Sequence, residues 1–560
     1  MFSPKWLLIY ILVFAFLVRV AGINYGLPLW LIDDEPPFTL AALKMIQLKT
    51  LLPASYLEEF RTVLYYPPYL SYLYLLPFSI LLGIKYLLFS GGREQFIYYL
   101  TSDLSQFFLI ARFFNVLMGV VSVYLLYRVA KNILRQEAPA LLAAFFLTTS
   151  LFHILMSTNG RHWLPVSFFT ILVLWILNLD WEFRLIPRSG TPDPAMRDLG
   201  KRYLAAVLAV GVGVGVSPIN VLLLILIAVW YLFYEQRNLS ALIKEKYFYG
   251  SLVIFAWLAI LPGALYPQSF GFRGDLTFQE TKSILGIVTS LFIFLKPVVL
   301  SEPILAFFAV LGLLFTVFHR RNLFWPVFLF IYAYSAIFYL FFRYEHRFTL
   351  PVFPILAIMA AYGVAESYKR INSRILIAIL ILILAMPAVF SLRLSYLLYQ
   401  NDSRNHLIEW TQANIPSGSK ILVYARLTRL PATPEAIKEQ RIIDSGSLRK
   451  VDLAEENFPK QPSFHALNLY TIQNQEFYSG LENYAKKQKY QYLLTSQIDF
   501  EKNPAHFNRI QSIASRGALL ESFGEFQERY SPYIGQLLGN PFNLFKIKEF
   551  GPPVALYKLP

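Results

Sequence analysis

Long apolar runs, separated by short charged connections, dominate the first 400 residues of the chain. A helix of about 20 apolar residues can cross the ~30 Å hydrocarbon core of a bilayer. The first run has no small-residue cleavage site, so we expect a retained anchor rather than a removed signal peptide. The pattern predicts about eleven transmembrane helices, near residues 5–23, 107–128, 138–156, 162–180, 203–217, 218–234, 248–266, 298–318, 323–342, 348–366 and 374–394.

One further apolar run, Tyr69 to Phe89, does not fit this count. It contains Pro77 and many tyrosines, which favour the membrane interface. Counting it as a span would place either the amino terminus or the later basic clusters on the wrong side. We therefore predict an interfacial or re-entrant helix within the first outer loop, residues 24–106.

Basic residues follow alternate helices, so the eleven crossings would gather them on one side of the membrane. By the positive-inside rule that side is cytoplasmic, which predicts a cytoplasmic-membrane protein with its amino terminus inside. This orientation accounts for the net charge of +15 without nucleic acid as a partner. The residues are Lys5, Arg128, Lys131, Arg135, Arg184, Arg188, Arg197, Lys201, Arg202, Arg237, Lys244, Lys246, Arg320, Arg321, Lys369, Arg370 and Arg374.

The composition agrees with a membrane domain followed by a soluble one. Over the whole chain 56% of residues are hydrophobic and 15% are charged, whereas soluble domains carry about 25% charge. From residue 400 onward the pattern changes to a helix that ends at Pro416, followed by short strands. The expected fold is an all-α polytopic membrane domain (1–396) with interfacial helices in its first outer loop, and an extracytoplasmic soluble α/β domain (397–560). The strands are predicted at 420–425, 490–496 and 553–560.

Three consecutive carboxylates, Asp33, Asp34 and Glu35, follow the first apolar run. Two prolines come next, and proline suits the first turn of a helix. An apolar stripe that includes Phe38 and Met45 predicts that this helix lies along the membrane surface. One carboxylate could simply cap the helix. Three adjacent carboxylates repel one another, which points to a further role as a base or a cation site.

Arginines with apolar flanks occur in the other outer loops, at Arg112, Arg161 and Arg347. Each could anchor the interface, but charge at the membrane edge costs free energy unless it is paired or used. Carboxylates and arginines on one face suit transfer of a sugar from a lipid phosphate. The phosphate leaving group is a weak base, so it needs bidentate positive charge rather than a general acid. One carboxylate would accept the proton of the attacking hydroxyl.

The sequence resembles the C-type superfamily of polytopic glycosyltransferases, close to the family 39 protein O-mannosyltransferase and aminoarabinose transferase branch. Asp34 and Glu35 match the family's Asp-Glu pair after the first helix. The other similar stretches are "YYPPYLSYLYLL" with Pro67 and Pro68, "ARFFNVLMGVVSVYLLYRVAKNI" (111–133), "GRHWLPVSFF", "HRFTLPVFP" and "DSRNHLIEWTQANIPSGSKILV". The chain departs from the family at Ile32-Asp33, which replace His-Pro, at Tyr66, which replaces a charged residue, and at Trp163, which replaces Asp.

The resemblance implies an inverting transfer from a polyprenyl-phosphate-linked sugar to an acceptor hydroxyl on a glycan, lipid or protein, at the outer face of the membrane. Asp34 would be the base, and Glu35 would orient either Asp34 or the acceptor. Arg112, Arg161 and Arg347 would contact the donor phosphate. Additional site residues could be Asp33, Tyr66, His162 and His346.

We expect no cofactor and no resident metal. A divalent ion held by Asp33, Asp34 and Asp275 is the less favoured alternative. With no cysteine, disulfides and thiolate metal sites are impossible. Two other functions stay open: a non-catalytic membrane partner of an envelope glycan assembly complex, and a polytopic transporter or flippase.

Overall fold

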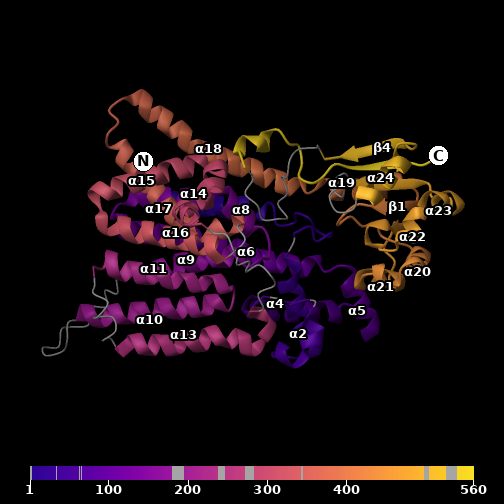
Figure 1. Cartoon of the computed structure of the whole chain (residues 1–560), viewed down its shortest axis with the longest axis horizontal. Helices are drawn as coiled ribbons and strands as arrows, with labels where there is room; N and C mark the ends of the chain where they lie inside the picture. Colours follow the sequence, from indigo (N-terminus) through magenta and orange to yellow (C-terminus); the bar gives the residue numbers. More distant parts are fainter. Residues whose placement is uncertain are drawn as a thin grey trace.

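The computed structural model describes residues 3–32, 34–61, 63–64, 66–179, 194–236, 246–270, 283–341, 345–496, 504–524 and 539–560. Within these ranges a helical bundle and a small α/β unit lie end to end (Figure 1). Six helices are long and apolar enough to cross a membrane, and one bent pair makes a possible seventh. The predicted fold class is therefore confirmed: a polytopic helical domain followed by a soluble α/β domain.

The bundle is built from helices separated by short connections. They are α1 (Pro4–Val20), α6 (Ser105–Leu134), α7 (Glu137–Thr149), α8 (Leu151–Ser157), α9 (Trp163–Leu177), α10 (Pro194–Val214), η2 (Pro218–Leu222), α11 (Leu223–Val229), η3 (Trp230–Tyr234), α13 (Lys246–Leu265), η4 (Pro267–Phe270), α14 (Ile284–Ser301), α15 (Pro303–His319), α16 (Arg321–Phe341), η5 (His346–Val352), α17 (Phe353–Tyr368) and α18 (Arg374–Gln400).

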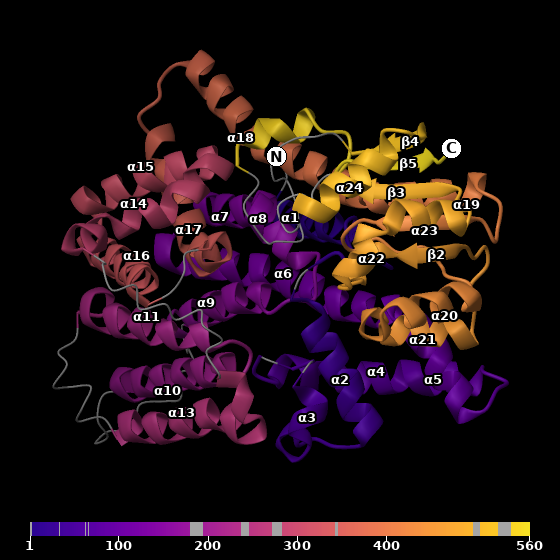
Figure 2. The ribbon, with the colours of Figure 1, turned by 45° about the vertical axis from the view of Figure 1, so that its right-hand side comes forward.

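The first outer loop forms a separate group of helices beside the α/β unit (Figure 2). They are α2 (Pro36–Leu48), η1 (Pro53–Tyr56), α3 (Leu57–Phe60), α4 (Tyr69–Leu87) and α5 (Arg93–Ser102). The predicted apolar stripe of α2 is present, but Phe38 and Met45 are buried within the protein rather than turned toward lipid. The helix α4 packs over that face, and the position of α2 along the membrane surface stays a prediction.

Two sequence predictions about the spans need correction. The run 138–156 is not one helix but α7 and α8, which meet at a bend of 59°. The run predicted at 298–318 is α15, and the apolar helix α14 precedes it, separated only by Glu302. Proline at position 303 starts a new helix, because its ring and missing N–H do not suit a helix interior. The α4 segment has the length and apolarity of a span, so its interfacial position stays a prediction.

The break between α7 and α8 is stabilised by two buried charged residues. Arg19 of α1 donates hydrogen bonds to the carbonyls of Leu147 (3.1 Å) and Thr148 (3.3 Å) at the end of α7, and contacts His153 Nδ1 at 2.9 Å. Glu302 accepts from Ser150 Oγ (2.7 Å) and from a backbone N–H at the start of α8. Helix ends inside a bundle need such partners, since their terminal backbone groups are otherwise unsatisfied.

Several predicted basic clusters meet at one end of the bundle. Arg320 donates to the carbonyls of Ile133 (2.8 Å) and Leu134 (3.3 Å), which end the same helix as Lys131. Arg370 lies over the ring of Phe315, 4.4 Å from its centroid. The opposite end of α6, which holds Arg112, faces the first outer loop. The side of the membrane on which this end of the bundle lies stays a prediction.

The C-terminal unit contains one five-stranded sheet in the order β2-β1-β3-β5-β4. Strands β2, β1 and β3 are parallel, whereas β5 is antiparallel to both β3 and β4. Strands β1, β3 and β5 were predicted, and β2 and β4 were not. The elements are α19 (Ser403–Asn414), β1 (Lys420–Tyr424), α20 (Pro434–Ile443), η6 (Ser445–Ser447), α21 (Lys450–Asn457), β2 (His465–Asn468), η7 (Leu469–Thr471), α22 (Gln475–Ser479), α23 (Leu481–Lys487), β3 (Tyr492–Ser496), α24 (Pro504–Ala514), β4 (Ala518–Phe523), η10 (Pro541–Phe545) and β5 (Val554–Lys558).

Replacing Arg19 by Met tests whether Arg19 stabilises the break between α7 and α8. The substitution leaves two buried carbonyls and His153 Nδ1 without their donor, which costs about 2 kcal/mol or more. We expect a clear fall in the melting temperature of the purified protein in detergent. Leu17→Met, on the exposed face of the same helix, is the control and should melt like the wild type. Equal melting temperatures for R19M and wild type would contradict this role.

Candidate active site

The carboxylate of Glu35 lies in a sealed ion pair with Arg112 of α6. Arg112 Nε and Nη2 each donate to one carboxylate oxygen at 2.7 Å, and neither side chain is exposed to solvent. The backbone N–H of Gly160 donates to the same carboxylate at 2.6 Å. Glu35 makes no side-chain hydrogen bond to the start of α2. The simple capping role therefore does not apply to Glu35.

Arg112 also binds the loop that precedes the carboxylates. Its Nη1 donates to the carbonyls of Ile23 (2.7 Å) and Tyr25 (2.8 Å). Four hydrogen bonds to protein acceptors thus surround this guanidinium. The phosphate contact predicted for Arg112 stays a prediction, but the side chain in this structure already ties the loop to α6.

Asp34 has different partners from Glu35 and remains partly open. Its backbone φ is 61°, in the left-handed region that aspartate tolerates better than most residues. Its Oδ2 accepts from Arg161 Nη2 at 3.0 Å and from Arg347 Nη1 at 3.1 Å. The Asp34 side chain is 26% exposed, whereas that of Arg161 is fully buried. The structure therefore joins the predicted base to two of the three predicted arginines.

The connection between α8 and α9 holds Arg161 in place. Asn115, one helical turn beyond Arg112 on α6, donates to the carbonyls of Asn159 (2.6 Å) and Arg161 (2.8 Å). Asn159 Oδ1 in turn accepts from the backbone N–H of Arg161 at 3.1 Å. At Gly160 an added Cβ would lie 3.2 Å from a Glu35 oxygen, so glycine lets this loop approach the carboxylate closely.

Arg347 is held from the other side of the site. Its Nε lies 2.6 Å from Glu345 Oε2. Its guanidinium carbon lies 5.4 Å from the centroid of the Trp163 ring and 5.9 Å from that of Phe348, in cation–π range. The side chain is 17% exposed. The aromatic faces of Trp163 and Phe348 therefore support this arginine.

Aromatic rings form the wall beside the charged groups. His162 lies in the connection before α9, 4.6 Å from the ring of Tyr66 and 5.3 Å from that of Phe38, measured between centroids. Burial lowers the pKa of His162 well below its usual range, and the charges of Arg161 and Arg347 add to this effect. The imidazole is therefore neutral at physiological pH. Tyr66 stacks on Phe38.

The remaining predicted residues are less informative. His346 is half-buried, and its carbonyl accepts a hydrogen bond from Thr349. Asp33 and Asp275, two of the three ligands of the alternative metal site, lie outside the described residues. Within the described ranges no group of three or more acidic, cysteine or histidine side chains is arranged around a possible metal ion.

Several contributors to the site were not predicted as functional. Glu345 forms an ion pair with Arg347. The sequence signal for this pair was the position of Glu345, two residues before Arg347. Asn115 has the i, i+3 spacing from Arg112 that places both on one helix face. The roles of Gly160 and Trp163 had no signal beyond their place in the same outer connection as Arg161.

No protein-family model and no curated protein sequence matches the chain. Solved structures show similarity at 11–14% identity. The Archaeoglobus fulgidus oligosaccharyltransferase tethered with an acceptor peptide has a TM-score of 0.44, at 14% identity, over 92% of this chain and 72% of that one. ArnT from Cupriavidus metallidurans bound to undecaprenyl phosphate has a TM-score of 0.45, at 11% identity, over 99% and 98%. Both belong to the C-type superfamily that the sequence resembles. Both TM-scores are below one half, so no conclusion about the activity of this protein is drawn from these similarities.

The sealed and the open carboxylate should respond differently to removal. Glu35→Ala leaves Arg112 as an uncompensated buried charge, which typically costs about 3–5 kcal/mol. We expect E35A to lower the melting temperature strongly. Asp34→Asn keeps an oxygen that can accept from Arg161 and Arg347 at a partly exposed position, and should change the melting temperature much less. Equal destabilisation by the two substitutions would contradict the division into a structural and an accessible carboxylate.

The depressed pKa of His162 predicts a specific pH behaviour. The folded protein holds this ring neutral, whereas the unfolded chain takes up a proton below the ordinary histidine pKa of about 6.5, so stability is lost as the pH falls through that value. His162→Gln should therefore leave the pH dependence of melting unchanged above neutrality. We expect it to weaken the loss of stability below about pH 6.5. A wild-type melting temperature that falls no more steeply than that of H162Q on acidification would contradict a neutral ring.

Proposed function

We propose that the protein is an inverting glycosyltransferase that moves a sugar from a polyprenyl-phosphate-linked donor to an acceptor hydroxyl, on the outer face of the cytoplasmic membrane. One observation carries this proposal. Asp34 is a partly open carboxylate held by two arginines, Arg161 and Arg347, at 3.0 and 3.1 Å. These are the groups that such a reaction needs: one proton acceptor and positive charge for a departing phosphate.

The arginines would bind the donor phosphate. Guanidinium groups bind phosphate oxygens bidentately and keep their charge at any relevant pH. Arg161 is fully buried and Arg347 is 17% exposed, and partial removal from water strengthens their electrostatic effect. When the donor enters, its phosphate oxygens compete with Asp34 for these two guanidinium groups. Donor binding would thereby release Asp34 Oδ2 for the acceptor.

Asp34 would then act as the general base. The acceptor hydroxyl gives its proton to the Asp34 carboxylate while its oxygen forms a bond to the anomeric carbon. The bond between that carbon and the phosphate oxygen breaks, and its electron pair leaves with the polyprenyl phosphate. Attack opposite the leaving group inverts the anomeric centre. No general acid is needed, because the phosphate leaves as a stable anion that the arginines neutralise.

Glu35 and Arg112 would position Asp34 without touching the substrate. Their sealed pair fixes the backbone one residue away from the proposed base, and a general base must lie within hydrogen-bond reach of the proton that it takes. The ring of Tyr66 and the neutral ring of His162 would form the wall of the sugar site. His162 lies close enough to Arg161 and Arg347 to feel their charge, and the ring of Tyr66 lies 4.6 Å from His162.

Replacing Asp34 by Asn tests the catalytic assignment. We expect product formation to fall about 10²–10⁴-fold, the range for loss of a general base. Product is measured by mass spectrometry of envelope glycans and lipids from cells that carry only the variant gene. Glu58→Gln makes the same charge change in the same outer loop, at a side chain that is 84% exposed. This control should keep the wild-type product level.

Binding of undecaprenyl phosphate, the lipid in the ArnT neighbour, separates the two proposed roles. D34N should bind this lipid at least as tightly as the wild type, because both arginines lose a competitor. Arg347→Gln should weaken binding about tenfold or more. Full product formation by D34N would exclude Asp34 as the base. An envelope profile unchanged by deletion of the gene would favour the scaffold or transporter functions instead.

A further inference from the structure

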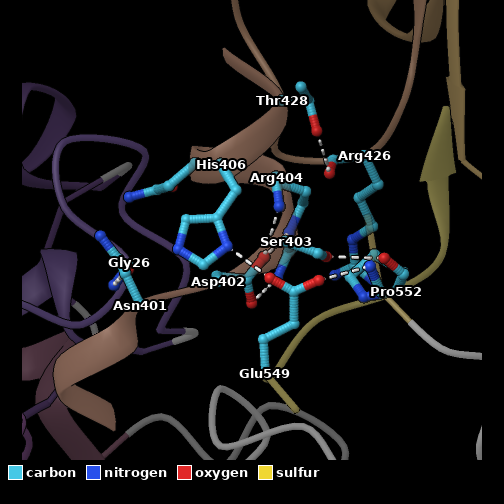
Figure 3. A network of polar contacts seen from close by, with 12 residues as sticks. Gly26, Asn401, Asp402, Ser403, Arg404, His406, Arg426, Thr428, Glu549 and Pro552 are labelled. Carbon is cyan, nitrogen blue, oxygen red and sulfur yellow. Dashed lines mark hydrogen bonds and ion pairs between the residues drawn. The ribbon is translucent and has the colours of Figure 1, made fainter. Parts of the chain in front are cut away.

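The start of the C-terminal domain is hydrogen-bonded to three consecutive residues of the first outer loop. Tyr25 OH donates to Asp402 Oδ2 at 2.7 Å, and the backbone N–H of Gly26 donates to Asn401 Oδ1 at 2.8 Å. The carbonyl of Leu27 accepts from Asn405 Nδ2 at 2.6 Å. Figure 3 shows Gly26 and Asn401 side by side at this junction. Two segments about 375 residues apart in sequence are thus joined residue by residue.

Asp402 is a rigid acceptor for the tyrosine. It is fully buried and caps α19, accepting from the backbone N–H of Arg404 at 3.1 Å. The Arg404 guanidinium grips the same carboxylate through Nε (2.7 Å) and Nη2 (3.0 Å), as Figure 3 shows. The following residue, Ser403, is fixed to the end of the chain, since its N–H donates to the carbonyl of Phe550 at 2.8 Å. Asp402 therefore moves with the C-terminal domain.

Tyr25 connects this carboxylate to the candidate active site. Its ring is 1% exposed and packs edge-on against Phe550, with centroids 6.0 Å apart. Its hydroxyl binds Asp402, while its own carbonyl accepts from Arg112 Nη1 at 2.8 Å. The same guanidinium binds Glu35, the neighbour of Asp34. A continuous path of buried polar contacts thus runs from the C-terminal domain through Tyr25 and Arg112 to the proposed base.

We infer that Tyr25 and Asp402 are positioning residues for the proposed base, and that the C-terminal domain sets the geometry of the active site through them. The inference rests on the proposed glycosyl transfer. Residues 21–30 form turns, and within them Ile23 and Tyr25 are hydrogen-bonded to Arg112 while residues 25–27 are hydrogen-bonded to the C-terminal domain. A shift of about 1 Å at a reacting group can cost about 10²-fold in rate. The C-terminal domain would therefore contribute to the rate of sugar transfer through these two residues.

Tyr25→Phe and Asp402→Asn are the variants that test this inference. Y25F removes one hydroxyl and keeps the buried ring. Each substitution should lower the initial rate of product formation about tenfold at saturating donor, with less than a twofold change in the donor concentration that gives half the maximal rate. The double variant should be no slower than the worse single variant, because both act on one hydrogen bond. Membranes containing the full-length protein are used throughout.

Ser403→Ala is the matched control. Its hydroxyl donates to the carbonyl of Pro552 at 2.6 Å, inside the C-terminal domain, and does not reach the outer loop. S403A should keep the wild-type rate even if it lowers the melting temperature. Hydrogen–deuterium exchange gives a readout that does not depend on activity. Exchange in peptides covering residues 26–35 should rise in Y25F and D402N and stay unchanged in S403A.

The outcomes separate this inference from the proposed function. If D34N abolishes transfer while Y25F and D402N keep the wild-type rate, the C-terminal domain does not position the base and the inference is wrong. A rate loss in Y25F that S403A matches at equal melting temperature would also overturn it, since general loosening of the domain would then suffice. If D34N itself keeps full activity, the proposed function is what fails.

Discussion

The sealed ion pair between Glu35 and Arg112 is the contact on which the geometry of the site depends. Removing two charges from water costs several kcal/mol each, and only close, multiple hydrogen bonds offset that cost. The structure supplies them: two contacts of 2.7 Å between the side chains, one from Gly160, and two from Arg112 to loop carbonyls. The first outer loop, α6 and the connection after α8 must therefore be assembled together. Asp34 is placed by this assembly.

The two neighbouring carboxylates differ in partners and in exposure. Glu35 is fully buried and paired with one arginine. Asp34 has a left-handed backbone conformation, is 26% exposed and is shared by two arginines, groups that can also bind phosphate. Among the described residues, Glu345 also pairs with Arg347. Exchange of partners, rather than a large movement, would then suffice to admit a charged donor.

Much of this arrangement follows from sequence, and the exceptions have physical causes. Apolar run lengths and basic clusters predicted the multi-pass bundle, and the order of outer loops placed Asp34, Arg161 and Arg347 at one end. The partner of Arg112 could not be predicted, because the choice between a phosphate and a buried carboxylate depends on depth in the fold. The break after Thr149 carries no proline or glycine; partners from α1 and from Glu302 stabilise it. The attachment of Tyr25 to Asp402 joins distant segments, which local pattern does not report.

A structure of the protein with undecaprenyl phosphate bound tests the central claim most directly. The account predicts phosphate oxygens about 3 Å from the guanidinium nitrogens of both Arg161 and Arg347. Asp34 should have lost at least one of its two arginine contacts and face open space beside the phosphate, while the Glu35–Arg112 pair remains closed. A phosphate bound elsewhere, with both Asp34–arginine contacts intact, would contradict it.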